Sequence, residues 1–290
     1  MSKMKLRFTE ESIEALMPIL NIIESDPQFA VHVALTRFPY LKEILEVESL
    51  DASCLVTSNS FPIQDSVKTS MQKVSLLIAN IAVKSKMLKA IYLDSNNLHS
   101  FGPKVAEILA TSASLEYVNM SNNYLESYFV EVAEAIKSSI SIKNFIINGN
   151  EIREHVEAGV NHLVQMASLT GIDISYNWSD AHLLEVFEAI LKTHNIKTLK
   201  FGDGRNSESF QFGETYIEKI FQVAIQSSLT KIIYPSDNSI MNTGFKGKFE
   251  GHKIDLENLT KALNHEKHFA EAITDVVVEY IGHSIDCIPN

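Results

Sequence analysis

The segment LKAIYLDSNNL, residues 88–98, decides the fold because its pattern recurs along the chain at a fixed interval. LEYVNMSNNYL, IKNFIINGNEI, LTGIDISYNWS and IKTLKFGDGRN begin at residues 115, 142, 169 and 196, so each copy starts 27 residues after the previous one. With the first residue of a copy taken as offset 0, apolar residues fill offsets 0, 3 and 5 in all five copies. A fixed period of this length indicates a solenoid of stacked repeats.

Each copy predicts one short strand and one helix. Ile91 and Leu93 flank an outward Tyr92, which is the two-residue alternation of a strand. Later in the first four of these copies, apolar residues at offsets 18 and 21 share one face of a helix. We expect Ser100, Ser127 and Ser179 to cap these helices, and Pro103 to lie in a first turn.

An asparagine follows the strand at offset 8 in four copies, as Asn96, Asn123, Asn150 and Asn177. Its amide can satisfy buried backbone groups of its own turn and of the neighbouring copy. We interpret these four residues as a structural ladder and not as a catalytic row.

The pattern loosens at both ends of the array. The copy from Ile196 has Gly204 in place of asparagine, and LTKIIYPSDNSI begins 33 residues later, at 229, which indicates a six-residue insertion within residues 203–214. Before residue 88, LEVESLDASCL from Leu45 keeps some of the pattern but has Glu48 at offset 3. The sequence leaves open whether this segment is a true first copy.

Terminal repeats need caps over their apolar faces, and helical patterns occur near both ends of the chain. We therefore divide the chain into an N-terminal helical cap, residues 1–44, a repeat array, residues 45–253, and a C-terminal helical cap, residues 254–290.

These motifs resemble leucine-rich repeats, and the 27-residue copies with full helices are similar to the ribonuclease-inhibitor subfamily. The resemblance implies an α/β horseshoe with parallel strands on the concave face and helices on the convex face. The residue composition of the chain also resembles that of leucine-rich-repeat effectors of Legionella-type intracellular bacteria. That likeness implies delivery into the cytoplasm of a host cell and a host protein as partner.

Composition favours a soluble folded protein, since 45% of the 290 residues are hydrophobic and 21% are charged. The formal net charge of −11 disfavours nucleic acid and anionic membranes as partners. No apolar run reaches the roughly 18 residues of a membrane-spanning helix, and no cleavable signal is visible. Cys54 and Cys287 lie far apart, which favours a reducing compartment.

Several groups of polar side chains have no pattern that favours a chemical site. His265 with His268 lacks the spacing of a zinc-protease motif, and no motif activates Cys54. His155 and His162 lie two helical turns apart, where they could hold a metal, but a solvated face of a convex-side helix is the favoured interpretation. The segment GFKGKFEG, residues 244–251, lacks the order of a phosphate loop. The sequence therefore predicts no catalytic residue, metal or cofactor, and not an enzyme.

The concave face is the predicted binding surface, because its outward side chains stack from copy to copy. Exposed tyrosines are favoured contact residues, and inserted loops often take part in recognition. The candidate partner-binding residues are Tyr92, Asp94, Tyr117, Asn119, Ile146, Asp173 and Lys200, with Arg205 and Phe210 of the insertion.

We therefore expect a monomeric module that binds a protein. A eukaryotic cytosolic regulator of a ribonuclease or of a small GTPase is the second hypothesis, since a basic partner would suit the charge. An enzyme is the third, and a cleft with paired titratable residues would favour it.

Overall fold

The computed structural model describes residues 2–55, 65–177, 182–201, 219 and 222–233 of the chain. Within these residues, eight parallel strands form one open sheet whose spatial order is the order along the chain. The strands are β1 (Lys3–Lys5), β2 (Ser49–Asp51), β3 (Ala90–Tyr92), β4 (Tyr117–Asn119), β5 (Asn144–Ile146), β6 (Gly171–Asp173), β7 (Thr198–Lys200) and β8 (Lys231–Ile233).

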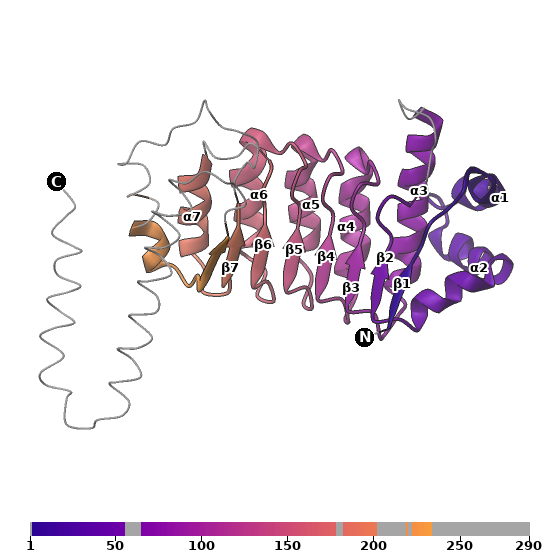
Figure 1. Ribbon diagram of the computed structural model, residues 1–290, viewed down its shortest axis with the longest axis horizontal. Helices are drawn as coiled ribbons and strands as arrows, with labels where there is room; N and C mark the ends of the chain where they lie inside the picture. The colour runs from indigo at the N-terminus through magenta and orange to yellow at the C-terminus, as the bar shows by residue number, and fades with distance from the viewer. Residues whose placement is uncertain (1, 56–64, 178–181, 202–218, 220–221, 234–290) are drawn as a thin grey trace, which may run out of the picture.

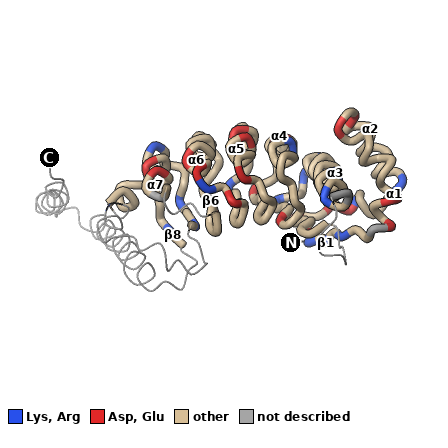
Figure 2. The backbone as a smooth tube through the Cα atoms, turned by 90° about the horizontal axis from the view of Figure 1, so that it is seen from above, with Lys and Arg blue, Asp and Glu red and all other residues tan. Residues whose placement is uncertain are grey.

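Helices form a second layer on one side of this sheet (Figures 1 and 2). The α-helices are α1 (Glu10–Leu20), α2 (Pro27–Arg37), α3 (Asp65–Ala82), α4 (Gly102–Ala110), α5 (Phe129–Ile136), α6 (Val156–Leu163) and α7 (Leu183–Leu191). Short 3-10 helices are η1 (Pro39–Leu45), η2 (His99–Phe101), η3 (Glu126–Tyr128) and η4 (Arg153–His155). This arrangement is a leucine-rich-repeat α/β solenoid, as the repeat predicts.

The sheet register follows the 27-residue period. Ile91 pairs with Val118, Val118 with Phe145, and Phe145 with Ile172, so residues at offset 3 meet across every strand boundary. These side chains are at most 2% exposed and form the sheet's contribution to the core. Each repeat therefore adds one strand to the sheet and one layer to the core.

A first copy exists before residue 88, but its predicted register is wrong by two residues. Leu50 pairs with Ile91, so this copy begins at Val47 and not at Leu45. Ala52 takes offset 5, and Leu55 stands where later copies have asparagine. The small Ala52 is a weak apolar signal, and Leu45 is the last residue of η1.

The predicted serine caps are also wrong for α4 and α5. Neither helix has a side-chain capping bond, because η2 and η3 precede them and carry Ser100 and Ser127. Pro103 does lie in the first turn of α4, as predicted. Ser179 lies outside the described residues.

The N-terminal end contains a strand that the helical pattern of residues 1–44 does not suggest. Polar and apolar residues alternate from Lys3 to Phe8, and Leu6 and Phe8 are buried. β1 extends the sheet beyond β2, and α1 and α2 follow at the same end of the array (Figure 1). The proposed C-terminal cap, residues 254–290, lies outside the described residues.

Candidate functional site

The outward side chains of β1 to β8 form what we call the sheet face, on the side away from the helices. Parallel pairing brings the middle residues of this face into one row that crosses the whole sheet. In spatial order the row is Lys5, Asp51, Tyr92, Asn119, Ile146, Asp173, Lys200 and Ile233.

Two tyrosines make the main aromatic contact of the sheet face. The rings of Tyr92 and Tyr117 lie 5.2 Å apart between centroids, with an interplanar angle of 40°. Lys3 Nζ lies 5.7 Å from the centroid of the Tyr92 ring. Both tyrosines and Ile146 are half-buried, so each keeps a surface that a partner can cover. The three side chains lie on neighbouring strands and form one apolar area of the face.

The ends of β2, β4 and β6 share a polar motif in which Asp or Asn is followed two residues later by Ser. In each, the first side chain accepts a hydrogen bond from the serine N–H, at 3.2, 3.0 and 3.0 Å, and another from the serine hydroxyl. These pairs are Asp51 with Ser53, Asn119 with Ser121, and Asp173 with Ser175. The motif holds these side chains against their own turns.

The strands between them, β3 and β5, differ in a regular way. They place Tyr92 and Ile146 in the middle row, and their next outward residues bridge to the following strand. Asn119 Nδ2 donates to Asp94 at 3.2 Å, and Asn148 Nδ2 donates to Asp173 at 3.4 Å. Apolar and hydrogen-bonded polar positions therefore alternate from strand to strand.

The Tyr117 hydroxyl is a neutral hydrogen-bonding group at physiological pH. Burial, together with the nearby Tyr92, Asp173 and Asp94, raises the pKa of Tyr117 to about 12. The Tyr117 hydroxyl therefore keeps its proton and can donate it to an acceptor on a partner.

Carboxylates on the sheet face differ in their environment. Burial and the neighbouring Asp51 raise the pKa of Asp94. Burial alone would raise the pKa of Asp51 too, but hydrogen bonds from Ser53 and the charge of Arg7 outweigh it and lower that pKa. Near the other end of the sheet, Lys200 Nζ lies 2.9 Å from the buried Asp173 carboxylate.

The ladder asparagines lie beneath the turns and are at most 1% exposed. The side-chain oxygen Oδ1 of Asn123 accepts a hydrogen bond from the Asn96 backbone N–H at 2.8 Å, and its Nδ2 donates to the backbone carbonyls of Leu93 and Met120 at 2.9 and 3.0 Å. Asn150 repeats these bonds one copy later. Their bonds to turn backbone give them a structural role.

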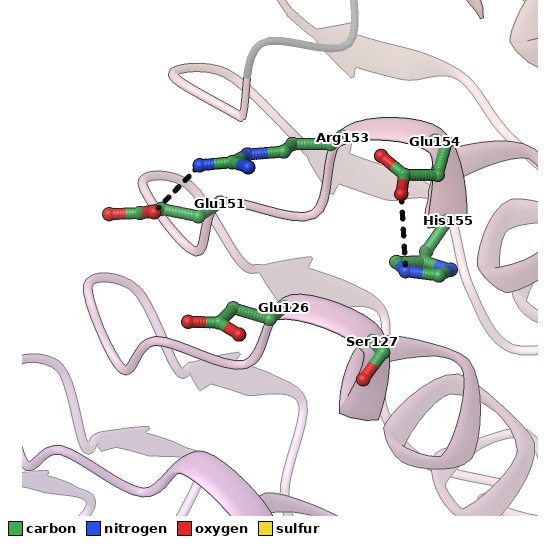
Figure 3. Close-up of a pocket in the computed structure, with 6 residues that line it drawn as sticks. All are labelled: Glu126, Ser127, Glu151, Arg153, Glu154 and His155. Carbon is green, nitrogen blue, oxygen red and sulfur yellow. Dashed lines mark hydrogen bonds and ion pairs between the residues drawn. The ribbon is translucent and has the colours of Figure 1, made fainter.

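A polar hollow of about 240 Å³ lies between η3 and η4 (Figure 3). Its charged groups are partly paired, since Arg153 lies 3.4 Å from Glu151 and His155 lies 3.9 Å from Glu154. On the helix layer, His162 Nδ1 lies 2.6 Å from Glu134 Oε2. No group of three metal-binding side chains occurs within the described ranges.

Arg205 and Phe210, the pair His265 and His268, and residues 244–251 lie outside the described residues. None of the described helices has both the length and the apolar character for crossing a membrane.

No protein-family model matches the chain, and no curated protein matches it by sequence. Among solved structures, the leucine-rich-repeat-containing protein LegL7 from Legionella pneumophila is similar, with 14% identity and a TM-score of 0.44. That match covers 86% of this chain and 98% of LegL7. Actin-binding site 2 of leiomodin-1 is similar at 11% identity and a TM-score of 0.32, over 78% of this chain and 92% of that one.

Proposed function

We propose that this chain is a non-enzymatic binding module that holds a partner protein against its sheet face. The contact between the half-buried rings of Tyr92 and Tyr117 carries this proposal. Tyrosine buries a large area on binding and loses few rotamers, so neighbouring outward tyrosines make an economical contact centre.

The other residues of the face surround this centre. Ile146 extends the apolar area, and Asp94, Asn119 and Asp173 are already oriented by hydrogen bonds. Preorganised polar groups lose little entropy when a partner binds. In this proposal Lys200 contributes at one end of the contact, and Arg205 and Phe210 of the inserted segment contribute at its edge.

We further propose that the partner is a host protein and that the chain acts as a bacterial effector in the host cytoplasm. Support for this finer proposal is the resemblance of the sequence to Legionella-type effectors. One experiment tests both the binding surface and the host origin of the partner, because capture can be compared between host lysate and a bacterial lysate.

The test compares the double variant Tyr92→Ala/Tyr117→Ala with the wild type. Each is immobilised and exposed to lysate, and the amount of partner protein that is captured and chemically cross-linked to it is measured. Loss of a contact centre worth about 2 kcal/mol lowers affinity roughly thirtyfold. The matched control is Tyr40→Ala/Tyr124→Ala, which removes two exposed tyrosines outside the sheet face. Melting temperatures of both double variants report on folding.

If the face variant keeps full capture while the control variant loses it, the sheet face is not the contact surface. Equal capture from host and bacterial lysates would contradict the effector proposal alone.

A further inference from the structure

We propose that the free edge of β1 binds an acidic, extended protein segment, which joins the sheet as an additional strand beside Lys3 and Lys5. This site uses the backbone edge of the sheet, whereas the tyrosine centre lies on the sheet face, and Lys3 borders both because its Nζ lies 5.7 Å from the centroid of the Tyr92 ring. It depends on β1, which extends the sheet beyond the first repeat copy.

The backbone of β1 pairs with β2 on one side, and no described residue pairs with its other side. The Ser2 carbonyl accepts the N–H groups of Glu48 and Ser49 at 3.1 and 3.2 Å, and the Leu6 N–H donates to the Asp51 carbonyl at 2.8 Å. Backbone groups of successive strand residues point to opposite sides. The N–H and C=O groups of Lys3 and Lys5 therefore point away from β2, at the outer edge of the described sheet.

The side chains at this edge are basic on one face and apolar on the other. Lys3 and Lys5 are exposed and lie on the sheet face, whereas Met4 packs partly against the core. Arg7 follows, with Nη1 3.6 Å from Asp51. Three cations thus lie close together in a chain whose formal net charge is −11.

Charge complementarity identifies the occupant. Residues directly opposite on paired strands interact, and opposite charges stabilise the pair. A segment that alternates acidic and apolar residues would place two carboxylates beside Lys3 and Lys5 and an apolar side chain beside Met4. A second copy of β1 fits poorly, because it would bring lysines together. Screening beyond about 8 Å limits the repulsion from distant carboxylates.

Lysines also protect edge strands from unwanted pairing. Edge lysines disfavour pairing with apolar or basic strands, but an acidic strand would neutralise the lysine charges. The two roles therefore differ in their response to an acidic peptide.

The probe is a short fluorescein-labelled peptide in which Glu and Val alternate, titrated with full chain that has no N-terminal tag and followed by anisotropy. We expect saturable binding and slower amide exchange at residues 3–5. Lys3→Glu/Lys5→Glu should weaken binding at least about tenfold, and the milder Lys3→Gln/Lys5→Gln should weaken it less. The matched control is Lys104→Glu/Lys192→Glu, which makes the same charge change at exposed lysines of the helix layer.

A second peptide has the same sequence with an N-methyl group on every backbone nitrogen, so it has no N–H to donate to β1. We expect it not to bind. Equal binding of this peptide would show charge attraction without strand addition and overturn the proposal. So would equal binding by the β1 variants, or no binding to the wild type. Concentration-dependent dimers that dissociate in Lys3→Glu/Lys5→Glu would assign the edge to a second copy instead.

Discussion

The regular copies from Leu88 onward and the first copy around β2 stack in the same sheet register with different residues at the turn. In the regular copies a buried asparagine holds the turn, whereas the first copy has Leu55 at the equivalent position. The Leu55 N–H is still satisfied, because it donates a hydrogen bond to the side-chain oxygen Oδ1 of Asn96 at 2.8 Å. Each asparagine therefore serves the copy before it as well as its own turn.

This difference explains why the first copy tolerates leucine. On its β1 side the chain leaves the repeat pattern at Thr9, which caps α1 by accepting the Ser12 N–H. No repeat turn stands on that side to be held by an amide. The ladder thus runs in one direction and ends at Leu55.

The largest effect should come from breaking the ladder inside the regular region. Asn123→Ala and Asn150→Ala each remove five side-chain hydrogen bonds from a buried position, whereas Asn96→Ala removes three to residues that the structure describes. We expect a loss of about 3 kcal/mol for each inner variant and about half of that for Asn96→Ala. Urea denaturation measures both. Equal losses at all three positions would contradict a ladder that weakens toward the first copy.

Helix packing is the second difference between the regions. α3 of the first copy has 18 residues, but α5 and α6 have 8 each. Between these short helices, a Cβ on Gly159 would overlap the ring of Phe129. We expect Gly159→Ala to cost about 2 kcal/mol, because overpacking exceeds the gain of about 1 kcal/mol in helix propensity.

Phe129→Leu is the partner variant for this site, since it opens the space that the added methyl group needs. In the double variant the cost of Gly159→Ala should shrink by at least about 1 kcal/mol. Additive losses would mean that the two residues do not share one packing constraint.

The third difference between the regions is that the pKa values of two carboxylates on the sheet face shift in opposite directions on folding. The pKa of Asp51, in the first copy, is lowered on folding, so its stabilisation is present at neutral pH and is lost as pH falls through its folded pKa. The pKa of Asp94, in a regular copy, is raised, so acidification relieves a cost that is present at neutral pH. Asp51→Asn should therefore destabilise at neutral pH, and Asp94→Asn should stabilise.

Both differences from the wild type should disappear in acid: that of Asp94→Asn below the ordinary aspartate pKa of about 4, and that of Asp51→Asn as the pH falls through the lowered folded pKa of Asp51. Denaturation across pH measures them, and carboxyl NMR titration reports the two pKa directions independently. A rise of the Asp51 pKa above that of Asp94 would reverse the assignment.

The sequence was sufficient for the regular region because its signals are local and repeated. Residues such as Ile91 and Val118 mark the strands directly, and their constant spacing sets the register that the sheet shows. The first copy lacks this support, since Ala52 is too small to mark an apolar position and the strand lies next to η1. β1 is only three residues long and precedes a clear helix pattern, so its alternation is easily overlooked.

The sheet face was predictable as a set of outward positions but not as an arrangement. The sequence places Tyr92 and Tyr117 on adjacent copies, whereas their ring contact depends on side-chain conformation. Apolar and polar residues of the middle row alternate from β2 to β6 with a period of two copies. A comparison of single 27-residue copies therefore does not reveal this alternation. Lys3 was not predicted to lie on the sheet face, because only the pairing of β1 with β2 places it there.

The smallest expected effect concerns the backbone of the turns, which both regions share. Cys54 in the first copy and Asn122 in a regular copy have positive φ angles of 47° and 53° at the same offset. Two residues later, Tyr124 also has φ 53° and is 50% exposed, whereas the preceding copy has Asn97 there. Asparagine tolerates this left-handed conformation better than tyrosine does, so Tyr124→Asn should stabilise the chain by about 0.5 kcal/mol. The reciprocal Asn97→Tyr should destabilise by a similar amount, and thermal denaturation of both variants gives the comparison. If Tyr124→Asn lowers the melting temperature, the tyrosine ring contributes packing that outweighs the backbone preference, and the turns are not interchangeable between copies.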